Sequence, residues 1–320
     1  MDTQLNTAEI RPRLSGLQAK YLPRIRETEL TLYILRKSPL AMTGIVIIAV
    51  FVLLAILAPF VSPADPNAIN LDSRLAPPGP SCLFGCDTLG RDVLSRVIYG
   101  SQISLFVGFS IVGIGLIVGS TLGLVAGYLG GKIGELIMRI ADVFMAFPPL
   151  VLALFFVTTM GPGLLHGLLA IGAVWWPRYT RLAYGQTLSV KTNDYIAAAR
   201  LAGLRSGGII MRHVFPNSMS PLIVQSSVDM GDAILTAAFL SFLGMGAQPP
   251  TAEWGSMVAM GRMYIFSNWW LSFFPGLAIA MLVLAINFLG DGLRDAFDPV
   301  IRRTISLKKE VIQADAGSND

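Results

Sequence analysis

Long apolar runs separated by short polar segments dominate this sequence. Helical residues rise about 1.5 Å each, so roughly 20 of them cross the hydrocarbon core of a bilayer, which is about 30 Å thick. Six runs meet or approach that length, at residues 40–61, 104–128, 140–159, 164–184, 220–244 and 270–289. In the fourth run the apolar character ends at Pro177, and we expect the helix to continue while Arg178 and Arg181 reach towards the headgroups. The pattern predicts an all-α polytopic membrane protein with six transmembrane helices.

The polar segments divide the chain into three parts. We predict a cytoplasmic N-terminal leader at 1–38, a membrane domain at 39–305 and a cytoplasmic tail at 306–320. The first apolar run follows a long leader and exceeds the apolar core of a typical signal peptide, so we expect it to remain in the mature protein.

The longest connection between spans, 62–103, follows the first span. Its prolines predict an extended first part. Four apolar residues then recur at helical spacing, namely Val93, Leu94, Val97 and Ile98. Asp92 and Arg96 lie four positions apart on another face. This pattern predicts a short helix on the membrane surface, ahead of the second span.

Composition and charge fix the orientation that we expect. Apolar residues make up 53% of the chain and charged residues 14%, which a soluble domain could not accommodate in runs of this length. With a cytoplasmic N-terminus, four of the 24 lysines and arginines lie outside, namely Arg74, Arg91, Arg96 and Arg262. The positive-inside rule therefore predicts that both termini are cytoplasmic. Aromatic residues do not interleave with the basic ones, so we expect no nucleic-acid binding.

The chemistry of a catalytic or metal site is missing from the sequence. His166 and His213 belong to no zinc motif, and Gly130-Gly131-Lys132 lacks the first glycine and the hydroxyl of a phosphate loop. We therefore expect no catalytic, metal or cofactor site on this chain. Cys82 and Cys86 lie in the outer loop, where they form a disulfide or remain two free thiols; two sulfurs alone would leave a zinc shell half empty.

A cytoplasmic segment of about forty residues between the fourth and fifth spans is too long for a simple turn. Residues 195–202 form a good short helix, which Asn193 or Asp194 can cap and Gly203 can end. Its small residues permit close docking against a partner. A second helix, 208–214, is expected to stop before Pro216.

This segment resembles the coupling loop of binding-protein-dependent ABC importer permeases. That pattern has Glu-Ala-Ala, a glycine four residues after the second alanine, and Ile-x-Leu-Pro after nine more. The matching positions are Ala198, Ala199, Gly203 and Pro216. Three positions depart from it, with Ala197 in place of the glutamate, His213 of the isoleucine and Phe215 of the leucine. The looser form is typical of the peptide and nickel branch.

Other stretches resemble the same branch in the same order, at 37–44, 84–96, 242–255 and 290–299. Together they identify the chain as similar to the C-type permease of a dipeptide, oligopeptide or nickel importer. Cys86 stands where that family usually has threonine, which favours the disulfide with Cys82.

The resemblance implies a type I ABC importer permease fold in the bacterial inner membrane, with a cytoplasmic coupling helix between spans 4 and 5. The implied partners are a second homologous permease, two cytoplasmic ATPases that bind the ATP, and a periplasmic or lipid-anchored solute-binding protein. The cargo would be a dipeptide, an oligopeptide or a related solute such as a nickel chelate. The residues expected to couple to the ATPases are Asp194, Tyr195, Ala197, Ala198, Ala199, Arg200, Gly203, Arg205 and Pro216.

Asp229 and Asp232 lie within the fifth span, three positions apart and so on one helical face. An ion at mid-membrane costs about 3 kcal/mol on insertion scales, so we expect these residues to avoid lipid. They would line the translocation pathway and meet a peptide amino group or a divalent cation, or they contact the partner permease or the outer mouth. Asp142 is expected to pair with Arg139.

A proton-coupled secondary transporter is the alternative function, with these aspartates as the proton relay. The sequence lacks a visible inverted repeat, and that function would leave the 194–217 segment unexplained.

Overall fold

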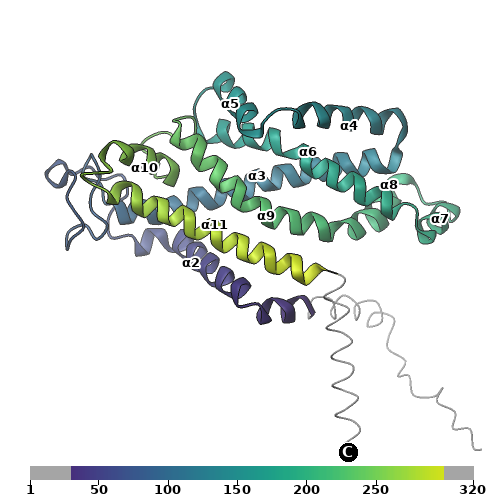
Figure 1. The fold of residues 1–320 in the computed structure, drawn as a ribbon, viewed down its shortest axis with the longest axis horizontal. Helices are drawn as coiled ribbons and strands as arrows, with labels where there is room; N and C mark the ends of the chain where they lie inside the picture. Colours follow the sequence, from purple (N-terminus) through teal and green to yellow (C-terminus); the bar gives the residue numbers. More distant parts are fainter. Residues whose placement is uncertain (1–29, 299–320) are drawn as a thin grey trace, which may run out of the picture.

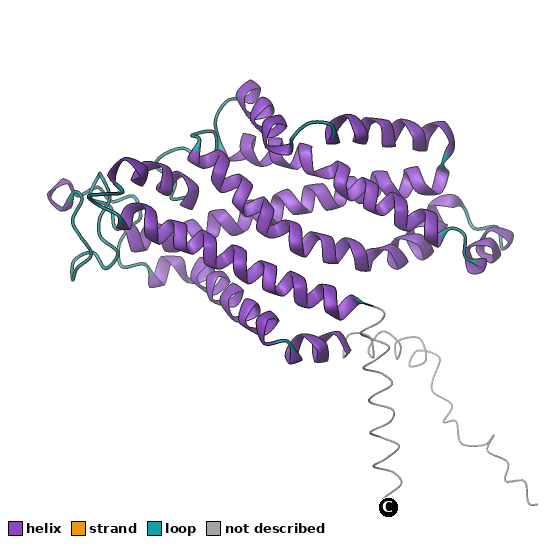
Figure 2. Ribbon diagram, viewed as in Figure 1, coloured by secondary structure: helices purple, strands orange, loops and turns teal. Residues whose placement is uncertain are grey.

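Five of the six apolar runs form continuous helices in the computed structural model, which describes residues 30–298. They are α2 Pro39–Val61, α3 Val93–Leu129, α6 Leu164–Val190, α9 Phe215–Phe242 and α11 Trp270–Phe297. These long helices run along the long axis of the molecule (Figure 1), and loops join them (Figure 2). The all-α prediction is confirmed for this part of the chain.

Length and hydropathy decide which of the helices can cross a membrane. Among the described residues, four helical stretches are long and apolar enough to cross a membrane, at Pro39–Val61, Val93–Leu129, Ser206–Phe242 and Trp270–Phe297. A bent pair of helices would make a fifth. The second half of α6 carries Arg178, Arg181 and other polar side chains, and α6 does not meet the same criterion. Six spans therefore stay a prediction.

The third predicted span is wrong as a single helix. The chain forms α4, Gly131–Met145, and α5, Pro149–Met160, which meet at an angle of 90°. Pro148 and Pro149 cause the break, because proline lacks an N–H donor and disfavours helical geometry in the residue before it. Pro148 adopts an extended conformation with ψ 126°.

The predicted surface helix before the second span is also wrong as a separate element. Its residues form the first turns of α3, and Val93 and Ile98 are buried. Asp92 does not pair with Arg96; its Oδ2 accepts a hydrogen bond from the Ser95 backbone N–H at 2.7 Å and so caps α3. A capped helix with a buried first turn continues straight into the span.

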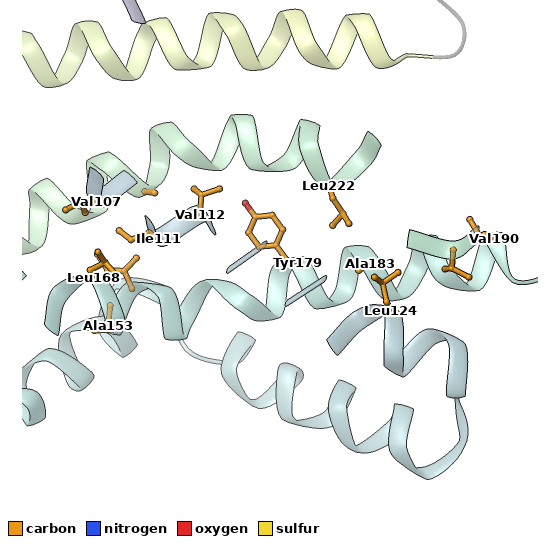
Figure 3. Packing of buried hydrophobic residues seen from close by; sticks show 14 of the residues in the cluster. Val107, Ile111, Val112, Leu124, Ala153, Leu168, Tyr179, Ala183, Val190 and Leu222 are labelled. Carbon is orange, nitrogen blue, oxygen red and sulfur yellow. The ribbon is translucent and has the colours of Figure 1, made fainter. Parts of the chain in front are cut away.

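Glycines bring α3 and α6 into direct backbone contact. A Cβ atom added to Gly119 or Gly123 would overlap the carbonyl oxygen of Trp176 or Thr180 on α6. The Thr180 hydroxyl donates to the Gly119 carbonyl at 3.0 Å. Small residues four apart are a common way to pack helices closely inside a membrane. This contact forms the centre of the core, where side chains of α3, α6 and α9 meet (Figure 3).

The two ends of the bundle differ. Figure 1 shows α7, Asp194–Leu201, at one end, and α10, Trp254–Gly261, with the 62–92 loop at the other. Short 3-10 helices at Leu71–Ser73 and Arg262–Tyr264 belong to the latter end. Residues 30–37 are helical, whereas the predicted leader up to residue 29 and the predicted tail lie outside the described residues.

Candidate functional site

α7 connects α6 to the segment that leads into α9, and its bounds lie within one residue of the predicted helix 195–202. Asn193 stands at the N-cap position, but its side-chain amide donates to the Val190 carbonyl at 3.0 Å and does not cap the helix. Asp194 occupies the first turn, where a negative charge is favourable next to the positive end of the helix dipole.

Gly203 ends α7 by a Schellman motif. The Leu204 N–H donates to the Ala199 carbonyl at 3.2 Å, and the Gly203 N–H donates to the Arg200 carbonyl at 3.0 Å. Gly203 has φ +80°, a left-handed conformation that glycine adopts without penalty. The predicted helix end at Gly203 is therefore confirmed, and its cause is the backbone geometry of this turn.

One face of α7 is buried and the other is open. Ile196 and Ala199 pack into the core of the bundle. The predicted coupling residues that are exposed are Tyr195, Ala197, Ala198, Arg200, Gly203, Arg205 and Pro216, together with Asp194. Leu201, which the sequence motif did not single out, is 90% exposed. An apolar side chain at the end of an otherwise polar and small-residue surface is the signal that would have identified it.

Arg200 and Arg205, which we grouped as coupling residues, have different surroundings. The Arg200 guanidinium lies 5.3 Å from the centre of the Tyr128 ring, at the end of α3. Arg205 precedes α8, Ser206–Ile209, and is exposed. α7 is thus tied to α3 by one of these two arginines.

The helix that was predicted to stop before Pro216 does not stop there. α8 continues through a π-helical turn, Ile210–Val214, into α9. Pro216 lies in the first turn of α9, and the wider π turn before it accommodates a residue that cannot donate a backbone hydrogen bond. The fifth span therefore begins directly from the 194–217 segment.

The two aspartates of α9 have unlike surroundings. Asp229 is 0% exposed, and its Oδ1 accepts hydrogen bonds from Arg178 Nη1 on α6 at 2.6 Å and from Gln225 Nε2 at 2.9 Å. Asp232 is exposed. Three helical positions differ by about 60° in direction, and at this point of the bundle that is enough to separate the core from the surface.

A second ion pair joins α6 to α4, between Arg181 and Asp142. The predicted partner of Asp142 is therefore wrong, because Arg139 pairs with Glu135 at 2.9 Å instead. Arg178 and Arg181 were expected to reach the headgroups, but each meets an aspartate of a neighbouring helix. Asp229 and Asp142 are the counter-charges of these arginines, whereas the sequence pattern predicted other roles for the two aspartates.

At the opposite end of the bundle, polar contacts join the outer loops. Cys82 and Cys86 form a disulfide. The buried Arg96 donates to the carbonyls of Pro66 at 2.9 Å and Pro250 at 3.3 Å, and so holds two loops together. Burial raises the pKa of Glu253, while hydrogen bonds from backbone N–H groups at the start of α10 act in the opposite direction.

Within residues 30–298, no group of three or more histidine, cysteine, aspartate or glutamate side chains is arranged to hold a metal ion. Two arrangements among the described residues are candidates for a functional site. One is the open face of α7, and the other is the pair of arginines on α6 with their aspartates on α9 and α4.

Known proteins resemble this chain in sequence and in fold. Residues 119–303 match the family described as binding-protein-dependent transport system inner membrane component. Residues 28–78 match the N-terminal TM domain of oligopeptide transport permease C. The chain belongs to this family of permease components of ABC importers.

Among individual proteins, the chain is 46% identical to the probable D,D-dipeptide transport system permease protein DdpC of Escherichia coli (strain K12), over 83% of this chain and 90% of that protein. It is 45% identical to the di/tripeptide transport system permease protein DppC of Pseudomonas aeruginosa (strain UCBPP-PA14), over 82% and 88%. Its fold resembles a chain of the inward-facing MetNI methionine ABC transporter, with a TM-score of 0.53 and 17% identity over 64% of this chain and 98% of that chain.

Proposed function

We propose that this chain is a permease subunit of an ATP-driven importer that moves short peptides across the bacterial inner membrane. Family membership and relatives named for dipeptide and di/tripeptide transport support this function. The complete importer would contain a second permease, two cytoplasmic ATPases and a solute-binding protein outside. Transport of nickel chelates stays a prediction.

The observation that carries the proposal is the open face of α7 at one end of the bundle. α7 follows α6 and is joined to α9 through α8 and the π-helical turn, so a force on α7 can reach both long helices. Its small side chains allow a partner surface to approach closely, and Leu201 adds an apolar contact. In the proposed cycle, the ATPases bind α7, and their closure on ATP moves α6 and α9 between inward-open and outward-open arrangements.

The pathway residues belong to the same proposal. Asp229 has no exposed surface and would act through Arg178, whereas Asp232 is exposed and can face cargo or the second permease. The side of the membrane follows from the role of α7: the end that carries it, and both termini, would be cytoplasmic, and the 62–92 loop would face outwards.

Reconstitution tests this function. The chain is assembled in proteoliposomes with its second permease, ATPases and solute-binding protein, and ATP-dependent uptake of a labelled dipeptide is measured. Leu201→Glu places a charge in the proposed apolar contact and should lower uptake at least tenfold and weaken ATPase association. Leu83→Glu changes an equally apolar side chain, 60% exposed at the opposite end, and should leave ATPase association unchanged.

Two results would contradict the proposal. Uptake driven by a proton gradient without ATP would favour the secondary transporter instead. Unchanged ATPase association in Leu201→Glu would remove α7 from the interface.

A further inference from the structure

A strip of ionisable side chains crosses the exposed faces of α4 and α6. On α4, Glu135, Arg139 and Asp142 follow each other at spacings of four and three and so share one face. On α6, Arg181 and Arg178 continue the strip towards the middle of the bundle. Ionised groups avoid hydrocarbon, so this charged strip faces water or another subunit and does not face lipid.

A cavity of about 350 Å³ opens along the strip, between α4 and α6, and its lining includes Glu135, Arg139, Asp142 and Tyr184. Asp142 at its edge pairs with Arg181, and Arg178 lies one helical turn deeper. Arg178 is 14 residues from the first residue of α6 and 12 from the last, about 20 Å from each end. The strip thus leads from the α7 end of the bundle to a cation at its centre.

The Arg178 guanidinium has N–H donors that Asp229 does not occupy. Its side chain is 47% exposed, and within residues 30–298 the one acceptor recorded for it is Asp229 Oδ1, bound to Nη1. The Nε and Nη2 donors form the edge of a guanidinium that binds a carboxylate in bidentate fashion. Asp229 is buried, and Gln225 donates to the same oxygen, so Asp229 holds Arg178 in place until cargo binds.

Two buried polar atoms accompany this pair. The Tyr179 hydroxyl lies close to Asp229, and neither this hydroxyl nor Asp229 Oδ2 makes a hydrogen bond of good geometry among the described residues. Figure 3 shows Tyr179 pointing from α6 into the core near α9. After a small movement, the Tyr179 hydroxyl can donate a hydrogen bond to Asp229 Oδ2. This bond would partly replace the contact that Asp229 loses when Arg178 turns away.

We propose that Arg178 binds the α-carboxylate of the peptide during its passage, exchanging its contact with Asp229 for one with the cargo. The inference rests on the proposed function, because a short peptide always carries this carboxylate unless it is blocked. A carboxylate that crosses the membrane interior needs a counter-charge there, and arginine provides one with fixed planar geometry. The negatively charged Asp229 competes for the same guanidinium, so the cargo carboxylate binds weakly enough to be released.

A double variant separates this role from a structural ion pair. Arg178→Gln with Asp229→Asn removes both charges and leaves no buried ion unpaired, so the α6–α9 contact can persist as neutral hydrogen bonds. If Arg178 binds cargo, ATP-dependent dipeptide uptake should fall about tenfold to a hundredfold, the effect of losing one charge-assisted hydrogen bond during translocation. If the pair only joins the helices, the double variant should take up dipeptide at the wild-type rate, and the proposal is overturned.

The exchanged pair, Arg178→Asp with Asp229→Arg, gives a second test. It keeps an ion pair between the same helices but presents an anion at the exposed position, so uptake should be lost; uptake at the wild-type rate would overturn the proposal in this variant too. Asp291→Asn with Arg294→Gln removes the same two charges from an exposed part of α11 and should leave uptake unchanged.

Uptake by the wild-type importer in the same liposomes distinguishes failure of the proposed function from failure of the role of Arg178. Failure of wild-type uptake with ATP would refute the proposed function. Wild-type uptake together with an active double variant would refute only the role of Arg178. Binding-protein-stimulated ATP hydrolysis, measured on each variant, verifies that the complex has assembled.

Discussion

Two glycines of α3 leave no room for a side chain where this helix crosses α6. Gly123→Ala would press a methyl group against the Thr180 carbonyl oxygen and force the helices apart. We expect a loss of about 1–3 kcal/mol of stability, as for other overpacked cores, measured as a lower melting temperature of the purified protein in detergent. Gly113→Ala on the same helix meets no atom within 4 Å and should leave the melting temperature unchanged or raise it.

The cysteine pair is a second residue-scale feature that can be tested. Cys82 and Cys86 close a loop of five residues, which stabilises the outer loop by about 2 kcal/mol in the chain-entropy model. Denatured wild-type protein should react with a maleimide reagent only after reduction, measured as a shift in gel mobility. Cys82→Ser should expose one thiol that reacts without reduction. Two reactive thiols in unreduced wild-type protein would exclude the disulfide.

At this scale the sequence predicted residue types better than partners. The motif located Gly203, and hydropathy located the arginines of α6 at the point where apolar character ends. It could not predict that Arg178 meets Asp229, 51 positions away, because a contact between helices depends on their rotation about their axes. The same reason explains why Asp142 was assigned to its neighbour Arg139 rather than to Arg181.

Among the elements, apolar length predicted α2, α3, α6, α9 and α11 but not their continuations. α3 begins eleven residues before the predicted span, since Asp92 caps a turn whose apolar face is buried by other segments. The break between α4 and α5 is signalled by Pro148-Pro149, which hydropathy alone overlooks because proline does not interrupt an apolar average. Local backbone chemistry, and not hydropathy, fixes these boundaries.

The turn between α7 and α8 offers a test of element geometry. Gly203→Ala places a side chain at φ +80° and should destabilise the Schellman turn by about 1 kcal/mol. The α7 amides should then exchange with deuterium about fivefold faster, and coupling of ATP hydrolysis to uptake should weaken. Gly207→Ala lies in α8 without positive φ and without a neighbouring atom within 4 Å, and should change neither measurement. Equal effects of the two substitutions would refute the role of the turn.

For the whole molecule, the separation of α7 from the 62–92 loop predicts two membrane sides. Single cysteines at exposed positions, in a background with Cys82→Ser and Cys86→Ser, report the side. A membrane-impermeant maleimide added to intact cells should label Phe266→Cys, whose parent side chain is fully exposed at the α10 end, and should not label Leu201→Cys until the cells are opened. Labelling of both in intact cells would contradict the orientation.

The bent pair α4 and α5 decides whether the chain crosses the membrane six times. Gly131–Met145 and Pro149–Met160 pass the length and hydropathy test only together, and a bend of 90° is compatible with a broken span or with a re-entrant loop. Lys132, in the first turn of α4, and Pro162, shortly after α5, are both exposed. In the same cysteine-free background, a broken span should give labelling of Pro162→Cys in intact cells and of Lys132→Cys only in opened cells. A re-entrant loop would leave both positions on one side, and α6 would then have to cross in the opposite direction or not at all. The last residues of α6 lead into α7. At its other end, the Gly163 N–H donates to the carbonyl of Met245, which follows α9, at 3.2 Å. The two ends of α6 therefore lie at opposite ends of the bundle, and we expect the two probes on opposite sides of the membrane.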